Sequence, residues 1–403
     1  MKPDFDRKII RAILGILILY GKENPYMAGY VITMRSIEDI KNCIEKGIYS
    51  TEIRHKPSEN IWRKQHEGTF ADYLSMKAKD HIYFFSDRFL YGIGELVNIG
   101  GDCKFLCYQH ADDPLVPKDR SEYKKCRPLI DSFSESNRCM CLFRPTPQFF
   151  LKGVDMDAVL NSNPSAFRML RALWKVSFIK VDDEEDRALI DVILKHNEKY
   201  IDDDKECFPY DDSLHNHLKQ IDLSPYQFTY HNLAKNANIE GETWLKHEMA
   251  IEASLCDILS HNNIGSFGHW DYVSHQVIAS PFKPIDYMDK MDIFGYRLIP
   301  GFPTISKYLI IEIKKGFADI DTIGQLMKYV DFVTNEYAHG DYSMVEAFIV
   351  AYDFDEDTRQ ACKDKAVRNY ISGYRPVTAE EWHSIHLVKY RYKDNGFLFD
   401  ELK

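Results

Sequence analysis

The sequence predicts an α/β protein whose C-terminal part is a mixed sheet flanked by helices, with a separate α+β domain before it. Residues 241–403 read as a helix, three strands, a helix and a further strand, which is the order of a mixed sheet with covering helices. From Tyr26 onward, short β-like runs alternate with capped helices. A chain of 403 residues is also longer than a domain with a single hydrophobic core usually is, so we expect two domains.

In the N-terminal part, glycine, serine and aspartate mark the ends of the expected elements. Thr69 is expected to cap a helical turn over Phe70–Met76. The other elements expected there are a helix over 5–20, a strand from Gly29 to Met34, a helix from Ser36 to Gly47, two strands within Asp80–Val97 joined by a turn at Ser86–Arg88, and a helix from Asp182 to about Lys199.

The interval 200–240 is polar and contains Pro209 and Pro225, which predicts a connector with short helical pieces. It separates an N-terminal domain over residues 1–199 from a C-terminal domain over 241–403. The elements expected after it are a helix over Glu242–Ser260, strands near Tyr272–Ala279, Asp292–Leu298 and Lys307–Lys314, a helix over Asp321–Tyr337, a strand at Val345–Tyr352, a helix near Asp355–Tyr370 and a strand at Ile385–Tyr392.

Composition and charge narrow the function classes. The net charge of −11 excludes a protein that coats nucleic acid through bulk positive charge. It leaves a nuclease open, because a metal site concentrates carboxylates. The apolar run Ala12–Tyr20 is too short to span a bilayer and no small-residue cleavage site follows it, so we expect no membrane partner and a cytoplasmic location.

Nine cysteines without a regular framework are typical of a reducing compartment. Their spacers of three residues and one differ from the two-residue spacers of zinc sites, which favours small buried side chains over a structural zinc. The five that cluster in the sequence are Cys103, Cys107, Cys126, Cys139 and Cys141.

One strand carries a conspicuous pair of charges. Alternation along Tyr308–Lys314 puts Glu312 and Lys314 on one face and Ile311 and Ile313 on the other. Placing two charges on so apolar a strand costs on the order of several kcal/mol without compensation. Either a mutual ion pair or a bound metal with a nucleophilic water would compensate this cost.

Neighbouring segments favour the metal. Asp292 is expected to open the preceding strand, where its carboxylate can meet Glu312, and two such carboxylates repel unless a cation lies between them. Oxygen ligands of this kind suit Mg²⁺. Glu248 and Glu252 stand one turn apart on the preceding helix, and Gln325 and Tyr329 share a face of the following one.

Asp292, Glu312-Ile-Lys314 and Gln325-Leu-Met-Lys-Tyr329, in this order, resemble the PD-(D/E)XK nuclease superfamily, in particular its RecB-like branch. The resemblance covers about 160 residues and implies a restriction-endonuclease-like sheet. It also implies Mg²⁺ or Mn²⁺ bound by Asp292 and Glu312, with Glu248 binding a second metal ion or orienting a water. Lys314 would position the attacking water and help to deprotonate it. Gln325 and Tyr329 would then shape the site or touch the substrate backbone.

Some assignments stay open within this resemblance. The family's Pro-Asp pair is Met291-Asp292 here, and Asp286 or Asp289 is an alternative ligand. Glu252 is an alternative to Glu248, because a helix face does not separate residues four apart. Only Cys256 and Cys362 lie in this region, too few for an iron–sulfur cluster.

The segment Asp80–Val97 weakly resembles EVE and PUA-like β-barrel domains, which implies a recognition domain that stacks RNA or modified bases on aromatic rings. Trp62, which lies among basic residues, is the first candidate, followed by Phe84 and Tyr91; for any single one of these, core packing is the commoner role.

The whole chain is therefore expected to be a DNA endonuclease in defence against foreign or modified DNA, with a homodimer as the form many relatives take. An RNA endonuclease and a non-catalytic nucleic-acid-binding protein with a nuclease-like fold are the alternatives.

Overall fold

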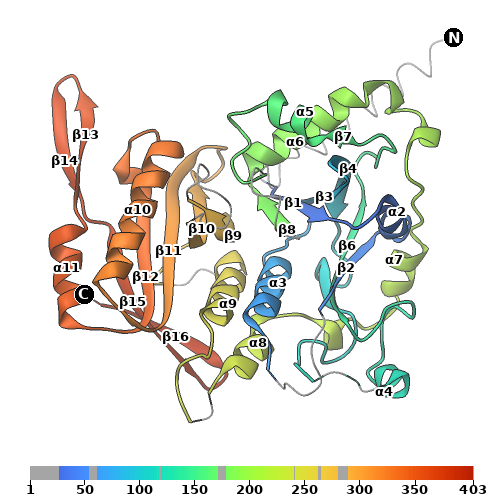
Figure 1. The fold of residues 1–403 in the computed structure, drawn as a ribbon, viewed down its shortest axis with the longest axis horizontal. Coiled ribbons are helices and arrows are strands. Elements are labelled where there is room, and N and C mark those ends of the chain that lie inside the picture. The colour runs from blue at the N-terminus through green and yellow to red at the C-terminus, as the bar shows by residue number, and fades with distance from the viewer. Residues whose placement is uncertain are drawn as a thin grey trace. The chain divides into compact units, whose positions relative to one another are not determined.

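The computed structural model describes residues 27–53, 61–115, 117, 119–170, 178–239, 241–261, 265–279 and 289–402. The chain forms two compact units that interleave along the sequence, so its contacts do not group by the division at 199 and 241 (Figure 1). Unit 1 comprises Met1–Gly47, Ala78–Asn98 and Phe143–His215, and unit 2 comprises Ile48–Lys77, Ile99–Leu142 and Asn216–Lys403. The helix expected over 5–20 lies outside the described residues.

Unit 1 is built on a sheet in which β1 is parallel to β3 and antiparallel to β8. The Ser36 hydroxyl accepts the amide of Asp39 and Gly47 ends the same helix at φ 61°, which confirms the expected helix and both of its caps. Asp87 and Arg88 form the expected turn, both at positive φ. The elements are β1 (Gly29–Thr33), α2 (Ile37–Lys46), β3 (His81–Ser86), β4 (Phe89–Leu96), β7 (Val154–Asp155), α5 (Met156–Ser162), β8 (Phe178–Val181) and α6 (Asp183–His196).

The N-terminal share of unit 2 contains β2 (Ile48–Glu52), α3 (Lys64–Leu74), β5 (Lys104–Leu106), α4 (Arg120–Lys125) and most of β6 (Asn137–Pro145), whose last residues belong to unit 1. The cap expected at Thr69 is wrong: α3 begins at Lys64, and the Thr69 hydroxyl donates to the Gln65 carbonyl one turn back. Of the five clustered cysteines only Cys126 is partly exposed, and the others are buried, as expected of small core side chains.

The segment between the two expected domains holds short helical pieces, as predicted. These are α7 (Ser213–Leu218), α8 (Tyr230–Ala237) and single 3₁₀ turns at Glu198–Tyr200, Asp204–Glu206 and Ser224–Tyr226.

The C-terminal part of unit 2 is a six-stranded mixed sheet, in the order β16-β15-β12-β11-β10-β9. β9, β10 and β11 form an antiparallel meander, β11, β12 and β15 run parallel, and β16 is antiparallel to β15. The strands are β9 (Tyr272–Ile278), β10 (Lys290–Leu298), β11 (Ile305–Ala318), β12 (Val345–Phe354), β15 (Ile385–Lys393) and β16 (Gly396–Glu401). The expected mixed α/β class is thereby confirmed.

Helices cover this sheet. α9 (Glu248–His261) packs its buried face on Ile293, Leu309, Ile311 and Ile313, and it also contacts α3 and α8 (Figure 1). α10 (Ile320–Glu336) contacts β11, β12 and α11 (Glu356–Lys365), and a 3₁₀ turn at Tyr342–Met344 precedes β12. Within the described residues no helix combines the length and the apolar character needed to cross a membrane.

Three C-terminal expectations need correction. α9 begins at Glu248 and not at Glu242, because the preceding residues turn back to pair with Ala237 and Asn238. Asp292 is the third residue of β10 and does not open it. The helix expected to reach Tyr370 ends at Lys365, and the hairpin β13 (Arg368–Tyr374) and β14 (Val377–Trp382) follows, since its β-branched and aromatic residues favour extended backbone.

The close packing of β9 on β10 can be tested at Gly295. A Cβ there would lie 2.5 Å from the Tyr272 carbonyl oxygen, which is backbone and cannot move aside. We expect Gly295→Ala to lower the free energy of unfolding by about 2 kcal/mol, measured by urea denaturation. Gly324→Ala on α10 is the matched control, because nothing lies near its Cβ, and it should stabilise by roughly 0.5–1 kcal/mol. Equal effects of the two changes would contradict this account.

Candidate functional site

The site is centred on β11, where Glu312 and Lys314 point to the same side as expected. The Lys314 Nζ donates to the Glu312 Oε1 at 2.7 Å. Glu312 is buried, with 1% of its side chain exposed, whereas Lys314 keeps 27%. The Glu312 Oε2 is buried and has no hydrogen-bond partner within the described part of the chain. The ion pair therefore satisfies only half of this carboxylate.

Burial raises the pKa of Glu312, although Lys314 acts against it, and the nearby Glu248 and Glu252 add to the rise. Burial alone would lower the pKa of Lys314, but Glu312 and then Asp292 raise it above its ordinary value. Lys314 therefore stays a cation, beside the carboxylates of Glu312 and Asp292.

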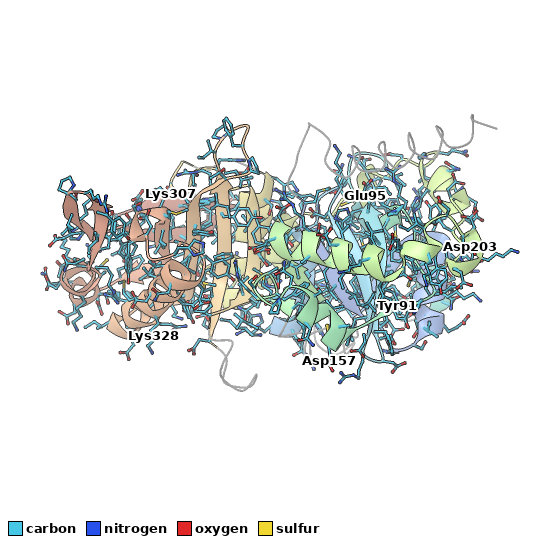
Figure 2. The ribbon with its side chains drawn as sticks, turned by 90° about the horizontal axis from the view of Figure 1, so that it is seen from above. Tyr91, Glu95, Asp157, Asp203, Lys307 and Lys328 are labelled. Atoms are coloured by element: carbon cyan, nitrogen blue, oxygen red, sulfur yellow. The ribbon has the colours of Figure 1, made fainter. Side chains whose placement is uncertain are left out.

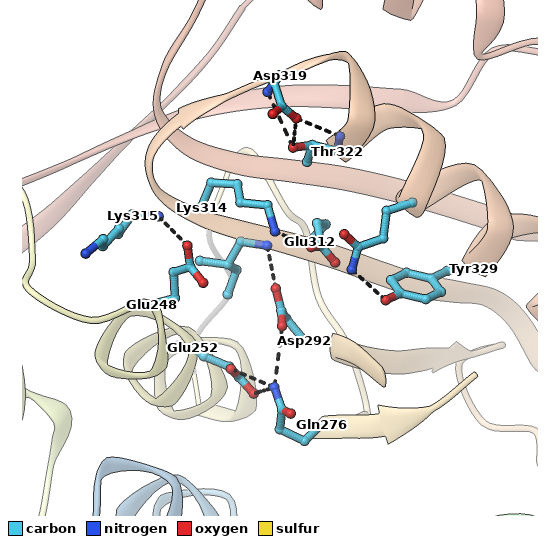
Figure 3. Close-up of polar contacts among 12 residues, drawn as sticks. Glu248, Glu252, Gln276, Asp292, Glu312, Lys314, Lys315, Asp319, Thr322 and Tyr329 are labelled. Carbon is cyan, nitrogen blue, oxygen red and sulfur yellow. Dashed lines mark hydrogen bonds and ion pairs between the residues drawn. The ribbon is translucent and has the colours of Figure 1, made fainter. Parts of the chain in front are cut away.

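Asp292 enters the site from the adjacent strand β10. Its Oδ2 accepts the backbone amide of Ile313 at 2.7 Å, which ties the carboxylate to β11 between Glu312 and Lys314 (Figure 3). Burial, then the charges of Glu252 and Glu312, raises the pKa of Asp292 well above its ordinary value. The two carboxylates expected to meet do repel each other here.

Helix α9 supplies the two alternative glutamates, and their surroundings differ. Glu252 is 2% exposed and accepts hydrogen bonds on both oxygens from the Gln276 amide, at 3.0 and 3.1 Å. Glu248, half-buried, accepts the backbone amide of Lys315 at 3.4 Å and no other hydrogen bond from the residues that the structure describes. Its carboxylate is therefore the freer of the two.

Helix α10 closes another side of the site. The Gln325 amide donates to the Tyr329 hydroxyl at 2.7 Å, so the two side chains hold each other in place (Figure 3). Burial raises the pKa of Tyr329, and the charges of Glu312 and Asp292 add to this. Tyr329 therefore stays a neutral hydroxyl beside the carboxylates. Asp289 lies just before β10 and its charge also acts on Tyr329, while Asp286 falls outside the described residues.

Three residues of this site carry no signal in the sequence. His275 on β9 contacts the Asp72 Oδ1 through Nε2 at 2.8 Å and the Glu252 Oε1 through Nδ1 at 3.2 Å. Burial alone would lower its pKa, but Asp72 and Glu252 raise it to about 10. Gln276 joins Glu252 to the Asp292 Oδ1, at 3.4 Å. Only the tertiary fold brings Asp72, on α3, to the other two.

The donors present fit a divalent cation. Among the described residues no group of three or more His, Cys, Asp or Glu side chains is placed to hold a metal ion. The Glu312 Oε2 and the Asp292 carboxylate are nevertheless hard oxygen donors that share one nearby ammonium, Lys314, and Mg²⁺ or Mn²⁺ would supply further positive charge.

The aromatic candidates for base stacking lie in the interior. Trp62, in unit 2, is 2% exposed, donates its indole N–H to the Asp112 carbonyl and packs edge-on against Phe70. In unit 1, Phe84 is fully buried, and Tyr91, labelled in Figure 2, is buried on β4. All three have the core role that is the commoner one for such residues, because a stacking platform needs an exposed ring face.

Comparison with known proteins gives little. No family model matches the chain, and no curated protein matches it. Among solved structures the chain is similar to the crystal structure of a repair endonuclease from Pyrococcus abyssi, at 25% sequence identity. The match covers 21% of this chain and 32% of that one, with a TM-score of 0.16. So partial a likeness carries no argument, and the function has to be inferred from the site.

The repulsion at Asp292 can be measured. Asn keeps an acceptor for the Ile313 amide but removes the charge, so we expect Asp292→Asn to raise the stability of the metal-free protein by roughly 1 kcal/mol. Thermal denaturation with a chelator, then with excess Mn²⁺, checks this: Mn²⁺ should raise the midpoint of the original protein and leave that of the variant unchanged. A variant less stable than the original protein without metal would show that the charge is well compensated.

Proposed function

We propose that unit 2 is a metal-dependent endonuclease that hydrolyses DNA phosphodiester bonds, with Asp292 and Glu312 as ligands of Mg²⁺ or Mn²⁺. The observation that supports this most directly is the buried, unpartnered Oε2 of Glu312. A structural ion pair would satisfy the whole carboxylate, whereas a metal ligand keeps one oxygen available.

A divalent ion bound there would lower the pKa of a bound water and offset charge on the phosphate. The residues of the chain have complementary tasks. Lys314 is held by Glu312 and is partly exposed, so its ammonium remains accessible to a substrate. It can orient the water and donate to a phosphate oxygen. Glu248 offers its freer carboxylate as a further ligand or to a metal-bound water. Gln325 and Tyr329 present a neutral hydrogen-bonding edge to the substrate backbone.

DNA is the proposed substrate because the RecB-like resemblance favours it. RNA cleavage, and nucleic-acid binding without cleavage, are the alternatives that the experiment separates. Recognition of modified bases by the N-terminal part, a role in defence and a homodimer stay predictions from resemblance.

The decisive test is cleavage of closed circular DNA by the full chain with Mg²⁺, beside a matched single-stranded RNA. We expect DNA nicking, and we expect Lys314→Ala to slow it by about 10²–10³-fold, as loss of a group that stabilises transition-state charge does. Lys307→Ala is the control: Lys307 lies on the same strand, β11, but bonds the Ser343 carbonyl (Figure 2).

Undiminished cutting by Lys314→Ala would reject the role given to this residue. Cleavage of RNA alone would replace the substrate. Binding of nucleic acid with no cleavage under Mg²⁺ or Mn²⁺ would leave a non-catalytic binding protein.

A further inference from the structure

Gln276 occupies an unusual position on β9. The register of β9 on β10 puts it opposite Asp292, since Val277 pairs with Met291 and His275 with Ile293. Its φ is 53°, in the left-handed region that costs a non-glycine residue about 1 kcal/mol or more. Successive strand residues normally point to opposite faces, yet here His275 and Gln276 both reach Glu252. The left-handed backbone at Gln276 thus accompanies the contact of two successive side chains, His275 and Gln276, with the same carboxylate.

The Gln276 amide nitrogen fills the space between two carboxylates. It lies 3.0 and 3.1 Å from the oxygens of Glu252 and 3.4 Å from the Asp292 Oδ1 (Figure 3). An amide oxygen there would face three carboxylate oxygens, which fixes the NH₂ group in this direction. A donor now stands where a cation shared by Glu252 and Asp292 would have to bind.

His275 supplies the charge that Glu252 needs. Each of its ring nitrogens faces a carboxylate, Asp72 on one side and Glu252 on the other, and only the imidazolium can donate to both. Glu252 therefore has a cation on one oxygen and an amide donor on both, and it needs no metal.

The hydrogen-bonded cluster serves its carboxylates unequally. His275 lies between Asp72 and Glu252. Lys314 contacts one oxygen of Glu312, and Asp292 has the Ile313 amide and a long contact from Gln276. The available oxygens, Glu312 Oε2 and the weakly bonded Asp292 Oδ1, are also enough to begin one coordination shell.

We propose that Gln276 is a positioning residue that reserves the site for one divalent cation, held by Asp292 and Glu312 and kept away from Glu252. This inference rests on the proposed function, because it concerns the ion that the endonuclease would use.

Titration of the full chain with Mn²⁺, following free Mn²⁺ by electron paramagnetic resonance, counts the ions without relying on cleavage. We expect one Mn²⁺ per chain. Gln276→Glu has the same shape but replaces the donor by a third carboxylate beside Glu252 and Asp292, so it should bind two. Gln360→Glu is the matched control, since its amide also donates to both oxygens of one carboxylate, that of Asp364, but it is exposed on α11 outside the site, and the variant should still bind one.

Two ions on the original protein, or one ion on a folded Gln276→Glu variant, would overturn the inference. If Gln276→Glu does not fold, the count on the original protein decides alone. DNA cleavage by a protein that binds two ions would leave the proposed function intact. A protein that binds no Mn²⁺ and cuts nothing would remove the proposed function as well.

Discussion

The C-terminal sheet depends on one constraint: it carries carboxylates on strands that are otherwise apolar and buried. A buried charge without a partner costs several kcal/mol, on the order seen when one member of a buried ion pair is removed. The chain compensates each carboxylate differently. Lys314 serves one oxygen of Glu312, the Ile313 amide serves Asp292, and His275 with Gln276 serves Glu252. Of these three carboxylates, Glu252 on α9 has donors on both oxygens. Uncompensated negative charge therefore remains at Glu312 on β11 and Asp292 on β10.

This constraint also explains why the site needs a segment from far away in the sequence. Asp72 contributes most to keeping His275 an imidazolium, with Glu252 second, and Asp72 lies on α3, 203 residues earlier. Glu67 on the same helix contacts His247 beside the start of α9. α3 thus belongs with the C-terminal sheet, which is how the compact units divide the chain. A domain cut at residue 241 would separate His247 from Glu67 and His275 from Asp72, and would leave His275 with Glu252 alone.

What the sequence predicts well is local. Two-residue alternation on β11 places Glu312 beside Lys314, and caps such as Ser36 and Gly47 set helix ends. What it does not predict depends on contacts between distant segments. The start of α9 is set by residues that pair back to Ala237, and the left-handed turn at Gln276 is set by Glu252 and Asp292. Trp62 looks exposed among basic neighbours, yet the fold buries it against Phe70.

Hydrogen bonds also distinguish Glu248 from Glu252, which helical spacing alone leaves equivalent. A cation on Glu252 would have to displace the Gln276 amide from both oxygens and would repel the His275 imidazolium. A cation near Glu248 would displace only a 3.4 Å contact from the Lys315 amide, on a half-buried side chain that solvent already reaches. Because loss of hydrogen bonds to a buried carboxylate costs free energy, a cation bound at this site would be expected beside the first turn of α9. Glu252 then serves to hold the Gln276 amide, which also contacts the Asp292 Oδ1.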